Sequence, residues 1–258
     1  MANTNEALYS SIIKDAEKIL TTSNENKNGL HPIFSFIKQF TDLITAEVAI
    51  NSYTTRLQSD INTKKILEAR YSGYFSSLIN HIELSSNRED FQFIDMSNYF
   101  YYSEDIIVNL NNFPIILNPW NSDRISLYLV DDVNSTGPIN KNTRSIIMNN
   151  IFYYPVGIAQ CFGGNHPQYS AKLKGGADTY FNSIQDISKL YNFIKFNGKE
   201  FKYVNPNILD KLSPRSFVPE NEQRVYLGIL FEIGRLLLKS PSIFPENIKE
   251  AITDCKKI

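Results

Sequence analysis

The chain has few of the residues that mark several common classes of protein. Its 258 residues include only two cysteines and three histidines. Cys161 lies in an apolar run and Cys255 near the end, so they form neither a disulfide framework nor a Cys-x-x-Cys site. His31, His81 and His166 are scattered and lack partners at metal-ligand spacing, so we expect no metal site.

Long apolar runs and an excess of one charge are also missing. No run reaches the ~20 residues that cross a bilayer, and the opening residues lack the basic and apolar regions of a signal peptide. The 26 basic and 27 acidic residues leave a net charge of −1, which disfavours extensive binding of duplex DNA. We therefore expect a cytoplasmic protein with no membrane partner.

The composition supplies enough apolar surface for a large core. Hydrophobic residues make up 42% of the chain and aromatic residues 13%, which suits one large domain or two small ones. Asparagine, isoleucine, lysine and tyrosine are abundant, a bias typical of AT-rich coding DNA. That bias favours a low-GC bacterium or its phage as the source.

The hydrophobic pattern predicts an α+β protein in three parts. Residues 1–90 have the spacing of helices, with apolar positions recurring on one face. Residues 91–215 contain short β-prone runs separated by turn residues, and residues 216–258 return to helical spacing. We expect a mixed core flanked by N-terminal and C-terminal helices.

Local patterns place several elements within these parts. Helices are expected at 7–20, after His31-Pro32, over 63–84, over 225–239 and over 245–256. Strands are expected at 113–117, 144–148 and within 151–162, and Ser122 or Asp123 is expected to cap a further helix. Residues 191–204 predict a hairpin with a type I′ turn at Asn197-Gly198.

The most informative stretch is a glycine elbow between an apolar run and a short helix. Residues 156–162 predict a buried strand, Gly163 and Gly164 permit a tight turn with positive φ, and Pro167 suits the start of a helix. The free N–H groups of a first helical turn attract anions, most often phosphate. We expect a preformed anion cleft here, although a Gly-Gly turn can also be a simple connection.

A second set of candidate residues follows Pro119. Arg124 could clamp a phosphate with two N–H groups, or it could be an ordinary surface arginine. Trp120 more simply packs beneath its loop than stacks on a base. Lys172 and Lys174 add positive charge beside the elbow, which suits either an anion site or a solvated helix face. The candidate ligand-binding residues are Gly163, Gly164, Asn165, His166, Arg124, Trp120 and Asn121.

The order of these motifs resembles the ParB/sulfiredoxin-like superfamily. The matching segments are Pro119-Trp120-Asn121-x-x-Arg124, the elbow Gly163–His166 and the run Gln168–Gly175. The chain is also similar to an uncharacterised bacterial family of domains of unknown function that carries the PWNxxR and GGNH motifs and a His-Pro-Ile helix start, here His31-Pro32-Ile33. The resemblance implies a ParB/sulfiredoxin-like mixed core.

The resemblance also implies a nucleotide site. Gly163, Gly164 and Asn165 would form the phosphate loop, and His166 would replace the superfamily's elbow His or Arg. The cofactor is unknown, with magnesium accompanying a nucleotide as one option. Pro167 replaces a further superfamily Arg, which removes one cationic contact. Asn165 stands where sulfiredoxin has its nucleophilic cysteine, so we expect no sulfinic acid reduction.

One more segment carries a resemblance that has a simple alternative. Residues 220–224 resemble the ENxQR segment that helps ParB to bind metal and nucleotide, but Glu220 or Asn221 could equally cap the following helix.

Two hypotheses about function come from these motifs. The first is a nucleotide or phosphate-binding protein, with weak NTPase activity as an option, although no general base can be named. The alternative is a non-catalytic interaction module in phage–host conflict, an antiviral-defence or phage regulatory protein that binds a protein or nucleic acid. A nuclease is a third idea, for which the sequence offers no clear carboxylate cluster.

Overall fold

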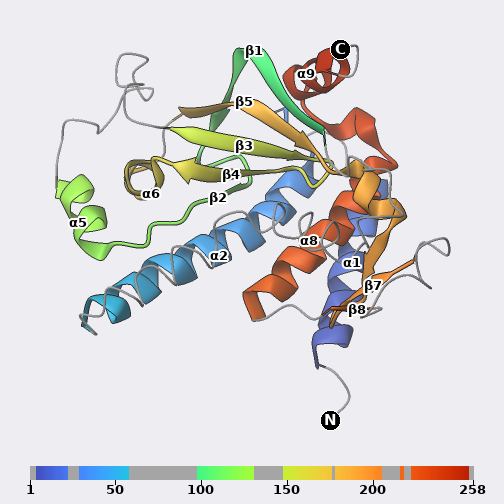
Figure 1. Cartoon of the computed structure of the whole chain (residues 1–258), viewed down its shortest axis with the longest axis horizontal. Coiled ribbons are helices and arrows are strands. Elements are labelled where there is room, and N and C mark those ends of the chain that lie inside the picture. Colours follow the sequence, from blue (N-terminus) through green and yellow to red (C-terminus); the bar gives the residue numbers. More distant parts are fainter. Residues whose placement is uncertain are drawn as a thin grey trace, which may run out of the picture.

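A five-stranded sheet lies at the centre of the protein, with long helices on one side (Figure 1). The computed structural model describes residues 4–22, 29–57, 98–130, 148–175, 178–204, 216–217 and 222–255. The expected helix at 63–84, most of the expected strand at 144–148, His81 and the capping residues Glu220 and Asn221 lie outside these ranges. The mixture of helices and sheets confirms the predicted α+β class.

The helices are α1 (Thr4–Thr22), α2 (Pro32–Leu57), α5 (Ser122–Val130), α6 (Asn165–Leu173), α8 (Glu222–Leu238) and α9 (Glu246–Cys255), with short 3-10 helices η3 (Ser188–Asn192) and η4 (Pro241–Ile243). The strands are β1 (Asn98–Asn109), β2 (Ile115–Ile116), β3 (Asn149–Tyr154), β4 (Ile158–Gly163), β5 (Asp178–Asp186), β6 (Ile194–Phe196), β7 (Phe201–Tyr203) and β8 (Ser216–Phe217).

The central sheet has mixed strand directions, in the order β1-β5-β3-β4-β2. β1 pairs antiparallel with β5, and β3 pairs antiparallel with β4. β3 and β5 are parallel, as are β2 and β4. β2 is therefore an edge strand, and the chain that leaves it runs beside the end of β4, where the elbow begins.

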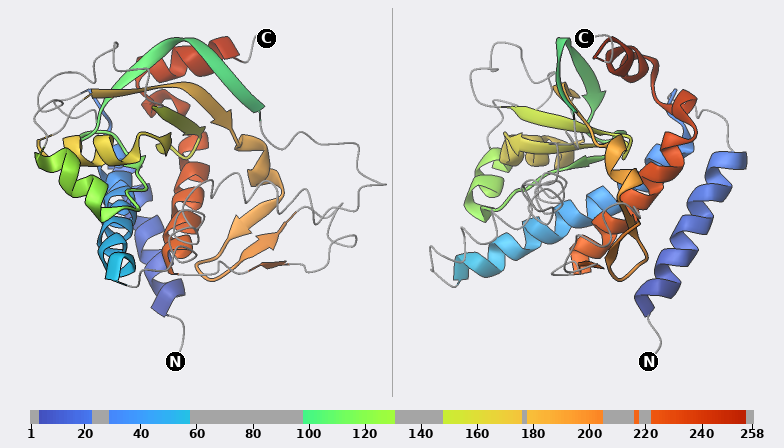
Figure 2. Two further views of the ribbon diagram at one scale, coloured as in Figure 1. Left: turned by 60° about the vertical axis from the view of Figure 1, so that its left-hand side comes forward. Right: turned by 45° about the vertical axis from the view of Figure 1, so that its right-hand side comes forward.

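α2 and α8 cover one side of the sheet, and α1 packs on their outer side (Figure 2). His31 starts α2 as the sequence predicts, because its Nδ1 accepts the N–H of Ile33 (3.2 Å). One hydrophobic cluster joins the N-terminal helices, the sheet and the C-terminal helices, with fully buried members such as Ala16, Phe152 and Ile248. The three predicted parts of the sequence thus share one core.

The chain turns between β3 and β4 where the sequence predicts a strand from Val156. Pro155 has no N–H to contribute to a ladder, and Gly157 takes a φ of +79°. The Gly157 N–H donates to the carbonyl of Tyr153 (3.1 Å), which closes the turn. β4 therefore begins at Ile158, two residues later than expected.

The predicted hairpin is present, but its turn differs from the expected type. Phe196 pairs with Phe201, so the tip spans 197–200. Asn197 is the first residue of the tip, and its Oδ1 accepts the N–H groups of Lys199 (3.0 Å) and Glu200 (2.9 Å). The expectation that Asn197-Gly198 is the central pair is therefore wrong, because the Asn197 side chain stabilises a turn centred one residue later.

Gly157 offers a test of this packing. A Cβ on Gly157 would lie 3.0 Å from Leu237 Cδ1 and 3.2 Å from Phe34 Cε1, whereas a Cβ on Gly29 (φ +71°) meets nothing within 4 Å. We expect Gly29→Ala to cost about 1–2 kcal/mol through backbone strain alone. Gly157→Ala should cost a further 1–3 kcal/mol or so through overpacking. Urea unfolding of both variants measures the difference, and equal losses would contradict this account of the β3–β4 turn.

Candidate anion-binding elbow

The elbow joins β4 to α6 through one left-handed residue. Gly164 has φ +78° and ψ 25°, a conformation that L-residues with side chains rarely adopt. The predicted order of strand, glycine and helix is therefore confirmed. α6 begins at Asn165, so Pro167 is its third residue rather than its first. Pro167 is tolerated there because the first N–H groups of a helix have no intrahelical acceptor.

The first turn of α6 presents backbone donors. Gln168 is the first residue to donate within the helix, to the Gly164 carbonyl (3.2 Å). Gly164 provides no side-chain cap, and within the described ranges the N–H groups of Asn165 and His166 have no acceptor. Two N–H groups at the positive end of a helix dipole are the elements of an anion site.

Two long-range hydrogen bonds hold the loop after β2 against the elbow. The Asn118 N–H donates to Asn165 Oδ1 (2.6 Å), and the Asn121 N–H donates to His166 Nε2 (3.0 Å). These partners are 47 and 45 positions apart in the sequence. The PWN motif and the GGNH motif are thus neighbours in space.

Asn121 is also the N-cap residue of α5. Its Oδ1 accepts the N–H of Arg124 (3.1 Å), which is the bond that an N-cap residue makes to the third residue of its helix. The expectation that Ser122 or Asp123 caps α5 is therefore wrong. Both residues lie within the helix, and Ser122 is buried.

Trp120 and Arg124 complete the group of candidate residues. The Trp120 ring is half-buried and meets the His166 ring edge-on, with 5.5 Å between ring centroids. Arg124 is exposed, and its Cζ lies 5.9 Å from the centroid of the Trp120 ring. Arg124 forms no ion pair with the described residues. The sequence-predicted site residues are therefore brought together.

Burial makes His166 a neutral side chain. Only 5% of the residue is exposed, and desolvation, helped by the charge of Arg124, lowers the pKa of His166 to about 4. Because Nε2 accepts a hydrogen bond from Asn121, the hydrogen bonding assigns the ring proton to Nδ1. His166 can thus donate one N–H to a ligand, but it supplies no positive charge near neutral pH.

A buried network of hydrogen bonds connects the elbow and α6 to β3 and β5. Gln168 is fully buried, and its Nε2 donates to Asn150 Oδ1 (3.2 Å) and the Gly163 carbonyl (3.4 Å). Thr179 Oγ1 donates to Gln168 Oε1 (2.7 Å), which links α6 to β5. Burial raises the pKa of Cys161, so its thiol stays protonated and donates to Gly163 (2.9 Å).

The sequence reading did not assign this supporting role to Gln168. Gln168 lies at the fourth position of α6, and helical periodicity places it on the side that faces the strands. That periodicity is the signal that could have identified it. Cys161 is an inert buried thiol rather than a reactive one.

The described ranges hold no group of three or more His, Cys, Asp or Glu side chains that could bind a metal ion. None of their helices combines the length and the apolar character needed to cross a membrane.

The fold and the elbow define an α+β protein whose polar site lies at a helix N-terminus. The chain belongs to a family of unknown function, DUF6710, whose sequence profile matches residues 1–244. No curated protein and no solved structure matches the chain. The expected membership in a family of domains of unknown function is confirmed, and the ParB/sulfiredoxin-like resemblance stays a prediction.

His166 makes stability depend on pH in a defined direction. The pKa is about 4 in the folded protein and about 6.5 for an ordinary histidine. Below pH 6.5 the unfolded chain takes up a proton that the folded protein does not. We therefore expect His166 to destabilise the protein progressively as pH falls from 6.5 to 4.

Chemical unfolding of the parent and of His166→Gln across this pH range tests the prediction. Glutamine can accept the Asn121 N–H but does not titrate. As pH falls from 6.5 to 4, the parent should lose unfolding free energy relative to His166→Gln. A constant difference would show that His166 is not held neutral.

Proposed function

We propose that the chain binds a nucleotide through its phosphates at the elbow Gly163–His166, with Arg124 supplying the positive charge. The observation that carries this proposal is the position of Arg124. Its guanidinium lies over Trp120, which contacts His166, and it has no acidic partner among the described residues. A cation that no described acidic group neutralises, beside a helix N-terminus, favours an anionic ligand.

Each element of the proposed site would offer a different kind of hydrogen-bond donor to a phosphate. The N–H groups of Asn165 and His166 donate along the helix axis, and the Arg124 guanidinium offers a planar pair of donors. His166 Nδ1–H is a further neutral donor. Magnesium would reach such a site with the phosphates of the nucleotide, since it binds phosphate oxygens and keeps several of its own waters.

Binding is better supported than hydrolysis. The Nε2 lone pair of His166 already accepts the Asn121 N–H, so His166 is not arranged as a general base. NTPase activity would need a base from elsewhere. We therefore place nucleotide binding first and weak NTPase activity second.

The alternative, a non-catalytic interaction module in phage–host conflict, has its own support. α2 and α5 contact each other and carry exposed apolar side chains, namely Ile50 (67% exposed), Leu127 (61%) and Val130 (84%). Exposed apolar groups of this kind favour a protein partner over a nucleic acid. This candidate predicts binding of a protein with no response to nucleotides.

A thermal-shift screen separates the two candidates. ATP, GTP, CTP and inorganic phosphate are tested with and without magnesium. A ligand at about 100 times its dissociation constant adds roughly 2.7 kcal/mol to the stability of the folded protein. A shift with a nucleotide supports the elbow proposal, and no shift with any of these compounds favours the interaction module.

Variants of Arg124 test the site itself. Arg124→Ala removes a charged donor pair, so we expect a loss of about 1.5–3 kcal/mol, or roughly 10- to 150-fold in affinity for the best nucleotide. Arg124→Lys keeps the charge but loses the paired geometry, so it should recover only part of the affinity. Isothermal titration calorimetry gives both values.

Two further variants complete this test. Lys14→Ala removes an exposed charge from α1 and serves as a matched control that should bind like the parent. Gly164→Val distorts the elbow, because a β-branched residue resists positive φ. If Arg124→Ala binds the nucleotide as tightly as Lys14→Ala does, the elbow is only a connection.

A further inference from the structure

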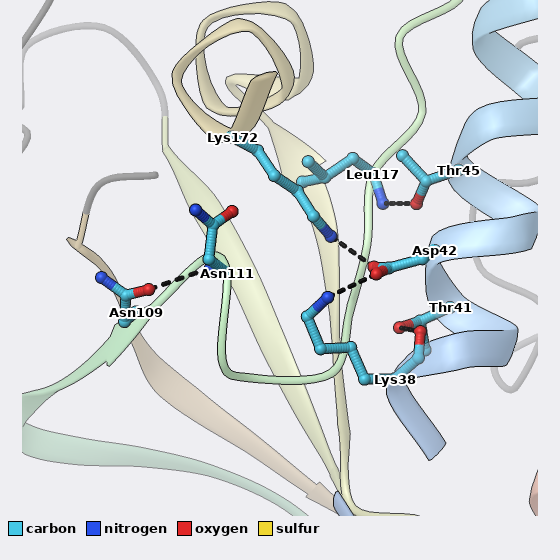
Figure 3. A network of polar contacts seen from close by, with 8 residues as sticks. All are labelled: Lys38, Thr41, Asp42, Thr45, Asn109, Asn111, Leu117 and Lys172. Carbon is cyan, nitrogen blue, oxygen red and sulfur yellow. Dashed lines mark hydrogen bonds and ion pairs between the residues drawn. The ribbon is translucent and has the colours of Figure 1, made fainter. Parts of the chain in front are cut away.

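Two lysines from different helices share one carboxylate beside α6. Lys38 and Asp42 are one turn apart on α2, and Lys38 Nζ contacts Asp42 Oδ2. Lys172 reaches across from α6, and its Nζ lies 2.5 Å from Asp42 Oδ1. Figure 3 shows both ammonium groups on the same side of this carboxylate, with Lys172 above and Lys38 below. We call Lys38, Asp42 and Lys172 the lysine–aspartate triad.

The triad is unbalanced in both charge and hydrogen bonding. Two ammonium groups and one carboxylate leave a formal charge of +1. The side chains of Lys172 and Lys38 are only 13% and 19% exposed. An ammonium has three donors, yet in the described part of the chain each of these makes a single bond, to Asp42. The shared carboxylate of Asp42 is 37% exposed, so the four other N–H groups lie where water or a dissolved anion can accept them.

Desolvation of Lys172 agrees with this imbalance. Burial lowers the pKa of Lys172, Asp42 raises it, and the like charge of Lys38 lowers it again, with a net decrease. The single shared carboxylate therefore does not compensate for the water that Lys172 has lost. A second anion close to both ammonium groups would do so.

We propose that Lys38 and Lys172 form a second anion site, which binds a phosphate group while Asp42 holds the two ammonium groups in place. A phosphate group offers three strong acceptor oxygens and a charge of about −1.5 to −2 near neutral pH, whereas a carboxylate offers two oxygens and a single charge. Lysine binds phosphate as a point charge and needs no planar geometry.

This site is separate from the elbow. Lys172 and Asn165 are seven residues apart on α6, which corresponds to roughly 10 Å along the helix axis. Thr45 Oγ1 of α2 accepts the Leu117 N–H (3.1 Å) at the start of the loop to the elbow. The two proposed sites have no ligand group in common.

Titration with inorganic phosphate tests the proposal in the full-length Arg124→Ala background, in which the elbow lacks its cation. We expect Lys172→Met and Lys38→Met each to weaken phosphate binding about tenfold or more, because each removes a charged donor but keeps an apolar stem. Lys14→Met, which removes a charge from α1, should bind as the background protein does. Loss of phosphate binding in this set leaves the elbow proposal untouched.

Asp42→Asn separates an anion site from a purely structural ion pair. Removing the carboxylate raises the charge of the triad to +2, so phosphate should bind more tightly, by about tenfold at low salt. Unchanged or weaker binding by Asp42→Asn overturns the proposal, and so does a phosphate affinity of Lys172→Met that equals that of the background protein. Equal affinity for acetate and phosphate would overturn the assignment of a phosphate group.

Discussion

The bond from the Asn121 N–H to His166 Nε2 determines the arrangement of the whole candidate site. It fixes the ring orientation of His166, and the Trp120 ring packs edge-on against that ring. Arg124 then lies over Trp120 because Asn121 also starts α5. One asparagine therefore connects the loop after β2 to the elbow and starts the helix that carries Arg124.

The bond at His166 is stable because burial keeps the ring neutral. A protonated imidazole has no lone pair to accept the Asn121 N–H, so the low pKa and the hydrogen bond support each other. The second bond, from the Asn118 N–H to Asn165 Oδ1, acts in parallel and does not depend on charge. The elbow thus has one contact that responds to acid and one that does not.

Other buried polar residues connect elements in the same way. Glu232 is 4% exposed, and its Oε1 accepts the N–H of Phe196 (2.8 Å) at the end of β6. Arg235 neutralises Glu232 and donates to the carbonyl of Ile194 (2.6 Å). Breaking one half of such a buried pair would leave an uncompensated charge, so α8 and the hairpin are held together by matched polar groups as well as by apolar packing.

The sequence was most informative where one backbone conformation favours one residue type. Gly164 in the elbow was found for this reason, because a left-handed conformation is a local property that favours glycine. The apolar stripes of α2 and α8 were found by their period. These signals were sufficient for the α+β class and for the elbow, whereas the loop after Pro119 was singled out by its PWNxxR motif.

The remaining details depend on partners that are distant in sequence. The cap of α5 falls on Asn121 because the same residue is anchored by His166, 45 positions away. The hairpin turn centres after Asn197, and a Cβ on Gly198 would lie 2.7 Å from Tyr9 Cβ of α1. Gln168 could be placed by periodicity only on the inner side of α6 until β5 supplies Thr179 as its partner. Lys172 suits an anion site and a solvated helix face equally well until α2 supplies Asp42. Pattern and propensity hold no information about such partners, since they describe neighbours along the chain only.

The charge distribution also restricts the kind of phosphate ligand that the chain can bind. The net charge is −1, yet Arg124 lies near the start of α6 and Lys172 near its end. Duplex DNA requires many cations spread over a surface, because its affinity comes from the release of many counter-ions. Two small groups of donors, one built on backbone N–H groups and one on a buried ammonium, instead suit one or two phosphates of a small ligand. The ligand that we propose for the elbow is therefore a mononucleotide and not a nucleic-acid polymer.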